Sequence, residues 1–183
     1  MKAIHREALG IIIVCMTLHA ASPTPELAIG DQLPLLQGEY LNGQRATLPK
    51  DSSGHVALLM LGFTYESRFA VEAWAKKFRQ DFAKQSKVTF FEVPMIGGLA
   101  RLGKWFIDGG MRRGTPKSDY GNVITVYGST DAWKQRTGFK DPNAAYLILI
   151  DQNGKVAWRY AGGFADQPYA ALSSAVSSLL DGE

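Results

Sequence analysis

Short runs of apolar residues predict the β-strands of this chain. Val56–Leu61 is apolar at every position, which is typical of a strand buried on both faces of a sheet. Three later runs have a similar length and composition: Val88–Pro94, Val123–Tyr127 and Tyr146–Asp151. Asp151–Gly154 then contains an Asn-Gly pair, which suits a tight hairpin turn, so Val156–Tyr160 is expected to pair with the preceding strand.

Helical spacing of apolar residues lies between these strands. Val71, Trp74, Phe78 and Phe82 fall on one face of a helix that follows the first strand. Residues 98–109, 131–137 and 167–180 predict three more helices, whereas residues 109–117 are rich in glycine and predict a basic loop. The alternating order indicates an α/β fold: a mixed central sheet with helices on both faces, ending in a β-hairpin and a helix.

The N-terminus has the layout of a secretory signal. Lys2 and Arg6 precede an apolar run at 9–18, and Ala20-Ala21 offers small residues for cleavage. We therefore predict a signal peptide at 1–21, a linker and N-terminal extension at 22–50 with short strands at 33–36 and 41–44, and one folded domain at 51–183. The prediction places the protein outside the cytoplasm, in the periplasm or attached to the inner membrane by an uncleaved segment. An organelle-targeting peptide is the alternative.

Composition narrows the classes of function. Of 183 residues, 46% are hydrophobic and 20% charged, as in an ordinary globular domain. The formal net charge is only +3, and the chain has no basic arm or arginine-rich helix, so we expect no nucleic-acid partner. Cys15 is the only cysteine and His55 the only histidine beyond the predicted signal peptide, so we expect no metal site and no cofactor.

Two motifs carry a family resemblance. Leu61-Gly62-Phe63-Thr64 follows the first apolar strand, and the later strand-Asp-x-x-Gly-strand-helix order begins at Tyr146. Together they resemble the thioredoxin superfamily, in particular its peroxiredoxin-like and Sco-like branches. In Sco-type copper chaperones a Gly-Phe-Thr precedes paired cysteines, and the matching positions here are Glu66 and Ala70. Because a thiolate is the nucleophile of disulfide exchange, the resemblance implies a thioredoxin-like domain that is not a thiol enzyme.

A further resemblance covers about residues 60–175. Its elements are Trp74, Phe91–Pro94, Gly110-Met111-Arg112-Arg113-Gly114-Thr115-Pro116, the strands around Tyr146–Asp151 and Trp158-Arg159, and Gly162–Ala165. In this order they resemble the mitochondrial ATPase assembly factor ten family, a thioredoxin-like family with bacterial members. The resemblance implies protein binding during assembly of the membrane sector of F-type ATP synthase. It makes membrane subunits of that complex the candidate partners and implies proximity to a membrane.

Five residues are candidates for contact with a partner. Glu66 and Arg68 occupy the turn where the superfamily carries its thiols, although Glu66 and Ser67 could instead cap the next helix. Arg112 and Arg113 could bind a carboxylate or phosphate, or pair with Asp108 or Asp119. Trp133 has polar neighbours and is the candidate for an exposed aromatic contact. The other tryptophans are expected to lie in the core or to be half-buried: Trp74, Trp105 and Trp158.

Other functions stay open at this point. One alternative is a relative of thioredoxin or peroxiredoxin oxidoreductases, and another is a periplasmic protein that binds an anion or small ligand at Arg112 and Arg113. Catalysis by Ser67 would need a base that the sequence does not place nearby. Pro142 lies about three residues before the register of the cis-proline of active thioredoxins, so we infer no cis bond from it.

Overall fold

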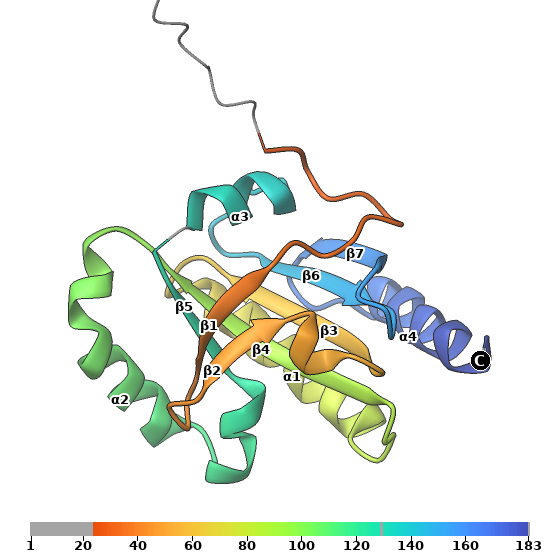
Figure 1. Cartoon of the computed structure of the whole chain (residues 1–183), viewed down its shortest axis with the longest axis horizontal. Helices are drawn as coiled ribbons and strands as arrows, with labels where there is room; N and C mark the ends of the chain where they lie inside the picture. The colour runs from red at the N-terminus through yellow and green to blue at the C-terminus, as the bar shows by residue number, and fades with distance from the viewer. Residues whose placement is uncertain (1–23, 129, 183) are drawn as a thin grey trace, which may run out of the picture.

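The strands of the protein form one mixed sheet. A computed structural model describes residues 24–128 and 130–182. The sheet has seven strands in the order β2-β1-β5-β4-β3-β6-β7 (Figure 1). They are β1 (Leu36–Tyr40), β2 (Arg45–Leu48), β3 (Val56–Gly62), β4 (Val88–Ile96), β5 (Ile124–Tyr127), β6 (Ala145–Ile150) and β7 (Val156–Gly162).

β3 lies inside the sheet and organises it. It runs parallel to β4, with Val56 opposite Val88, and antiparallel to β6, with Ala57 opposite Ile150. β4 and β5 are also parallel, whereas β1, β2 and β7 join by antiparallel pairing. Every residue of β3 is buried, as its uninterrupted apolar sequence predicts.

Helices cover both faces of the sheet. The structure contains α1 (Ser67–Phe82), α2 (Lys104–Gly114), α3 (Thr130–Thr137) and α4 (Asp166–Asp181), with short 3-10 helices at Lys50–Ser52, Gly98–Gly103 and Lys117–Asn122. Trp74 and Phe78 of α1 share one core with Leu172 of α4, on the face formed by the even-numbered residues of β3. Trp133 of α3 packs into a second core on the opposite face. This arrangement confirms the predicted α/β architecture with its C-terminal hairpin and helix.

The segment assigned to an N-terminal extension belongs to the sheet and its core. It supplies β1 and β2, and Leu27, Leu33 and Leu36 are buried. The strand predicted at 41–44 is instead the connection between β1 and β2, because Gly43 adopts a positive φ of 87° there. The predicted signal peptide and Cys15 lie outside the described residues. Within 24–128 and 130–182, no helix is long and apolar enough to cross a membrane.

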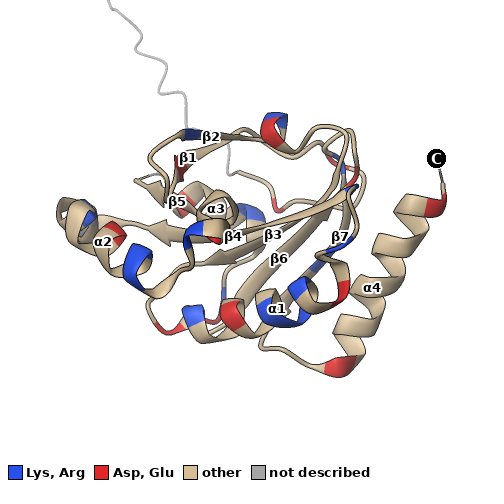
Figure 2. Cartoon of the chain, turned by 90° about the horizontal axis from the view of Figure 1, so that it is seen from below, with Lys and Arg blue, Asp and Glu red and all other residues tan. Residues whose placement is uncertain are grey.

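The stretch predicted as a glycine-rich loop is largely helical. The helix expected at 98–109 begins as a 3-10 helix at 98–103 and continues as α2 to Gly114, so Arg112 and Arg113 lie in its last turn. Among the residues of α2 only Asp108 is buried. The helix stands at one end of the molecule, opposite α4 (Figure 2).

Candidate partner-binding site

The turn between β3 and α1 is closed by reciprocal hydrogen bonds between Thr64 and Ser67. The Thr64 Oγ1 accepts the backbone N–H of Ser67 at 3.1 Å, and the Ser67 Oγ donates to the Thr64 carbonyl at 2.8 Å. Ser67 also accepts the N–H of Thr64 at 3.2 Å. A Cβ added at Gly62 would lie 2.8 Å from the Ser67 Oγ, so only glycine allows the strand to approach the helix this closely. Thr64 therefore caps α1.

A second loop is fastened against this turn. The Thr64 hydroxyl, besides accepting from Ser67, donates to the carbonyl of Pro142 at 2.6 Å. The Tyr146 hydroxyl accepts the backbone N–H groups of Lys140 and Asp141, each at 2.9 Å. These bonds hold the loop before β6 beside the start of α1. The peptide bond before Pro142 is not among the cis bonds of the described residues.

Two exposed aromatic rings enclose an arginine at the start of α1. The Arg68 guanidinium lies 4.0 Å from the ring centroid of Tyr65 and 4.5 Å from that of Phe69. Tyr65 is 68% exposed and Phe69 is 59% exposed, although large aromatic side chains of a monomeric domain usually pack inside. Glu66 is also exposed. We call this surface, formed by Tyr65, Glu66, Arg68 and Phe69, the α1 tip.

The α1 tip has the chemistry of a contact surface. Ser67 is completely buried, and its hydroxyl is engaged with the backbone of Thr64, so it is not presented as a nucleophile. Glu66 makes no side-chain hydrogen bond to the helix end, so the predicted capping role of Glu66 is wrong and Thr64 takes its place. The structure thus brings Glu66 and Arg68 together on the surface, beside two aromatic rings that the sequence analysis did not single out.

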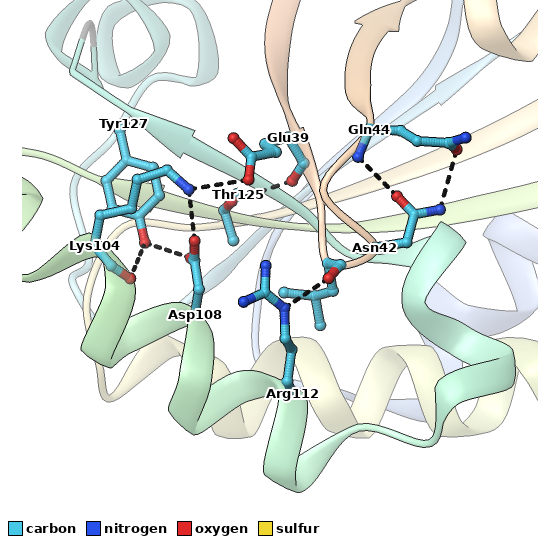
Figure 3. Close-up of polar contacts among 9 residues, drawn as sticks. Glu39, Asn42, Gln44, Lys104, Asp108, Arg112, Thr125 and Tyr127 are labelled. Atoms are coloured by element: carbon cyan, nitrogen blue, oxygen red, sulfur yellow. Dashed lines mark hydrogen bonds and ion pairs between the residues drawn. The ribbon is translucent and has the colours of Figure 1, made fainter.

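Arg112 and Arg113 lie in the last turn of α2 and not in a loop. The Arg112 Nε donates to the backbone carbonyl of Leu41 at 2.7 Å, which ties α2 to the connection after β1 (Figure 3). Arg113 is exposed, and its guanidinium lies beside Gly109 and Gly110. The alternative was that these arginines pair with Asp108 or Asp119, but both carboxylates pair with other residues. Asp108 lies 2.6 Å from the Lys104 Nζ, and Asp119 lies 3.3 Å from the Arg79 guanidinium.

A polar cluster attaches α2 to the sheet. The buried carboxylate of Asp108 accepts from the Lys104 Nζ and, at 2.6 Å, from the Tyr127 hydroxyl (Figure 3). Lys104 also reaches the Glu39 carboxylate at 3.1 Å. The hydrogen bond to Asp108 is the main cause of the raised pKa of Lys104. Every group of this cluster has a partner within the chain, so the cluster acts as an attachment of the helix rather than as an open binding site.

The tryptophans divide differently from the prediction. Trp133 is only 4% exposed, so its assignment as an exposed contact is wrong. Its helix places it with Thr130 and Thr137 on the buried side, and the Arg136 guanidinium lies 5.2 Å from its ring. Trp74 and Trp158 pack as predicted. Trp105 does not: it is 79% exposed on α2.

Comparison with known proteins identifies the fold. No family model matches the sequence, and no curated protein matches it. Among solved structures, a candidate protein disulfide isomerase from Bacteroides thetaiotaomicron superimposes with a TM-score of 0.60 at 14% identity, covering 85% of this chain and 91% of that one. The chain has a thioredoxin-like fold.

Two more neighbours agree with this assignment. A candidate thiol:disulfide interchange protein DsbE from Chlorobium tepidum gives a TM-score of 0.56 at 19% identity, covering 85% of this chain and 99% of that one. BsSco, a member of the Sco family of cytochrome c oxidase assembly proteins, gives 0.57 at 15% identity, with 85% and 96% covered. At these identities the likeness concerns the fold alone, and the function has to be argued from the residues of this chain.

Sequence reasoning missed the aromatic part of the α1 tip. A usable signal exists, because Tyr65, Arg68 and Phe69 are spaced like neighbours on one helix face. That face is separate from the apolar face of Val71 and Trp74, so rings placed there cannot pack under the sheet. The spacing could therefore have marked them as surface aromatics.

Proposed function

We propose that this thioredoxin-fold protein acts by binding a partner protein at the α1 tip, without redox chemistry. The observation that carries the proposal is the stacking of Arg68 between the exposed rings of Tyr65 and Phe69. Aromatic and arginine side chains are the residues most enriched at the centre of protein interfaces. They stand here at the start of α1, where the resemblance places the thiols of active relatives.

The biological role we propose is that of an assembly factor or chaperone for a membrane complex such as F-type ATP synthase. It is supported by the sequence resemblance to the ATPase assembly factor ten family, whose most specific element is the Met-Arg-Arg segment before Pro116. Export to the periplasm, or attachment to the inner membrane through the N-terminal segment, is part of the proposal. The partner is then a loop or terminus of a membrane subunit, bound without a covalent step.

Crosslinking and affinity capture from native membranes tests the role. The full-length chain should recover membrane subunits of ATP synthase, and Tyr65→Ala/Phe69→Ala should lower that recovery about tenfold or more, because truncating interface anchors typically costs over 1 kcal/mol each. The matched control is Ile29→Ala/Leu35→Ala, which removes two apolar side chains that are 70% and 61% exposed elsewhere on the surface. Equal recovery with both double variants would contradict binding at the α1 tip.

The oxidoreductase alternative gives a different result in the same assay. Thiol exchange requires a cysteine thiolate, and the chain has only Cys15. We expect Cys15→Ser to leave the recovered partners unchanged, with or without a reducing agent. Loss of the partner in that variant, or its release by a reductant, would favour the oxidoreductase relative and contradict the proposal.

A further inference from the structure

The helix α2 turns its aromatic side chains toward solvent. Trp105 is 79% exposed and Phe106 is 64% exposed, with their ring centroids 6.0 Å apart, and Leu102 just before the helix is 75% exposed. For Trp105 this is the opposite of the predicted packing. We call the surface formed by Leu102, Trp105, Phe106 and Arg113 the α2 outer face.

The polar side of the helix is the side that contacts the protein. Lys104, Asp108 and Arg112 follow one another at intervals of four residues, and all three bond to the sheet side of the molecule (Figure 3). Since the Asp108 carboxylate is buried against Lys104 and Tyr127, rotating the helix to bury its rings would expose this cluster and break its bonds. The aromatic side is therefore held outward by the polar attachment.

Positive charge accompanies the exposed rings. Between Gly97 and Asn122 the sequence has five basic residues and two acidic ones, an excess equal to the formal net charge of +3 of the whole chain. Both acidic residues are engaged, Asp108 with Lys104 and Asp119 with Arg79. Arg113 and Lys117 are exposed, and Figure 2 shows the basic positions of α2 at this end of the molecule.

We propose that the α2 outer face binds the surface of an anionic lipid bilayer. Trp, Phe and Leu on one side of a helix, with Lys and Arg beside them, are the composition of helices that lie in the membrane interface. Gly109 and Gly110 carry no side chains next to these rings, and the Arg113 guanidinium lies over this pair, where it can meet a lipid phosphate. The predicted membrane-directed run at 9–18 of the sequence would supply a second, separate attachment.

A lipid surface fits this face better than a protein does. A bilayer needs no shape complementarity, and its binding grows with the apolar area inserted and with attraction to anionic lipids. The proposal does not depend on the partner proposed for the α1 tip.

Tryptophan fluorescence can test the proposal on the full-length chain. The four tryptophans are Trp74, Trp105, Trp133 and Trp158, none of which lies in the predicted N-terminal signal segment, so that segment gives no signal of its own. The probe is vesicles of equimolar phosphatidylglycerol and phosphatidylcholine with brominated acyl chains, which quench tryptophans that enter the bilayer. Trp105→Phe keeps an aromatic ring at this position but removes the reporter, and Trp158→Phe is the matched control.

We expect quenching in the native chain and in Trp158→Phe, and at least a tenfold smaller quenching in Trp105→Phe. Arg113→Glu should weaken the vesicle binding, and raising the salt concentration should have the same effect because it screens the lipid charges.

Absence of quenching while the chain still sediments with the vesicles would show that only the N-terminus binds, which overturns the proposal. Equal quenching by pure phosphatidylcholine vesicles overturns the assignment to an anionic surface. These vesicles contain no protein partner, so failure here is distinct from failure of the capture experiment.

Discussion

Glu92 is a carboxylate in β4 whose surroundings oppose its charge. Burial is the main cause that raises its pKa from 4.5 to about 7, and the Arg79 guanidinium, 3.5 Å away, offsets only part of this effect. Arg79 is shared, because it also lies 3.3 Å from Asp119. The side chain of Glu92, next to Arg79 of α1, is therefore mostly protonated and neutral at mildly acidic pH.

The pKa of Glu92 makes the stability depend on pH. Between pH 4.5 and about 7 the folded state binds more protons at this group than the unfolded state, so its contribution to the free energy of unfolding falls as pH rises. The full change is roughly 3 kcal/mol at 1.36 kcal/mol per pKa unit. We expect Glu92→Gln to remove this component in urea unfolding measured from pH 4 to 8. The exposed Glu66→Gln is the control, and identical pH profiles of native chain and Glu92→Gln would contradict the assignment.

Thr64 joins three segments through one hydroxyl. It accepts from Ser67 at the start of α1 and donates to Pro142 in the loop before β6. We expect Thr64→Val to lower the free energy of unfolding by about 1–2 kcal/mol, the typical effect of losing a helix cap and a hydrogen bond, while Thr64→Ser keeps the hydroxyl and most of the stability. Urea denaturation compares them. A loss in Thr64→Ser without a loss in Thr64→Val would mean that the methyl group, and not the hydroxyl, matters.

At the scale of elements, α1 and α2 show opposite ways of attaching a helix. α1 buries Val71, Trp74 and Phe78 in an apolar core, which is the usual source of helix stability in a domain. α2 buries a carboxylate and relies on hydrogen bonds and ion pairs to β1 and β5. Polar contacts at a partly exposed site contribute little each, so α2 should open more readily than the core helices.

The attachment of α2 can be weakened at one residue. Asp108→Ala removes the acceptor of both Lys104 and Tyr127, and we expect backbone amides at 104–114 to exchange with deuterium at least several-fold faster while α1 keeps its protection. Hydrogen exchange followed by mass spectrometry gives the comparison. Asp131→Ala is the control, because this side chain is 92% exposed and 3.8 Å from its partner Lys134. Unchanged protection of α2 would indicate that its half-buried Ile107 and Met111 hold it instead.

At the scale of the whole molecule, the part of the sheet from β3 onward was predictable from the sequence, whereas β1 and β2 were assigned to an extension outside the domain. An uninterrupted apolar run of this length, such as Val56–Leu61, predicts a strand that is covered on both faces of the sheet. The two cores on either side of β3 follow from the alternation of its side chains. The order of the elements after β3 then follows from the short connections between strands and helices.

The surfaces were harder to predict, because sequence spacing gives the faces of a helix but not which face the fold covers. The apolar side chains at 102, 105 and 106 suggest a buried face, yet β1 and β5 offer polar groups at that position, and Asp108 takes the inner side. Trp133 shows the converse, since polar neighbours in sequence concealed a buried ring. In both helices the residues adjacent in sequence suggested one orientation, whereas the residues that contact the helix from other elements determine the orientation observed.

The place of β3 inside the sheet has a consequence for how the chain is made. β3 pairs with β4 on one side soon after both are synthesised, but its other edge is completed by β6, which follows only at Ala145–Ile150. Until then an entirely apolar strand exposes an unpaired edge, the kind of edge that recruits strands from other chains. A nascent or truncated chain that ends before Ala145 is therefore a template for aggregation, and a chain that is exported would have to be kept unfolded or shielded until Ala145–Ile150 arrives.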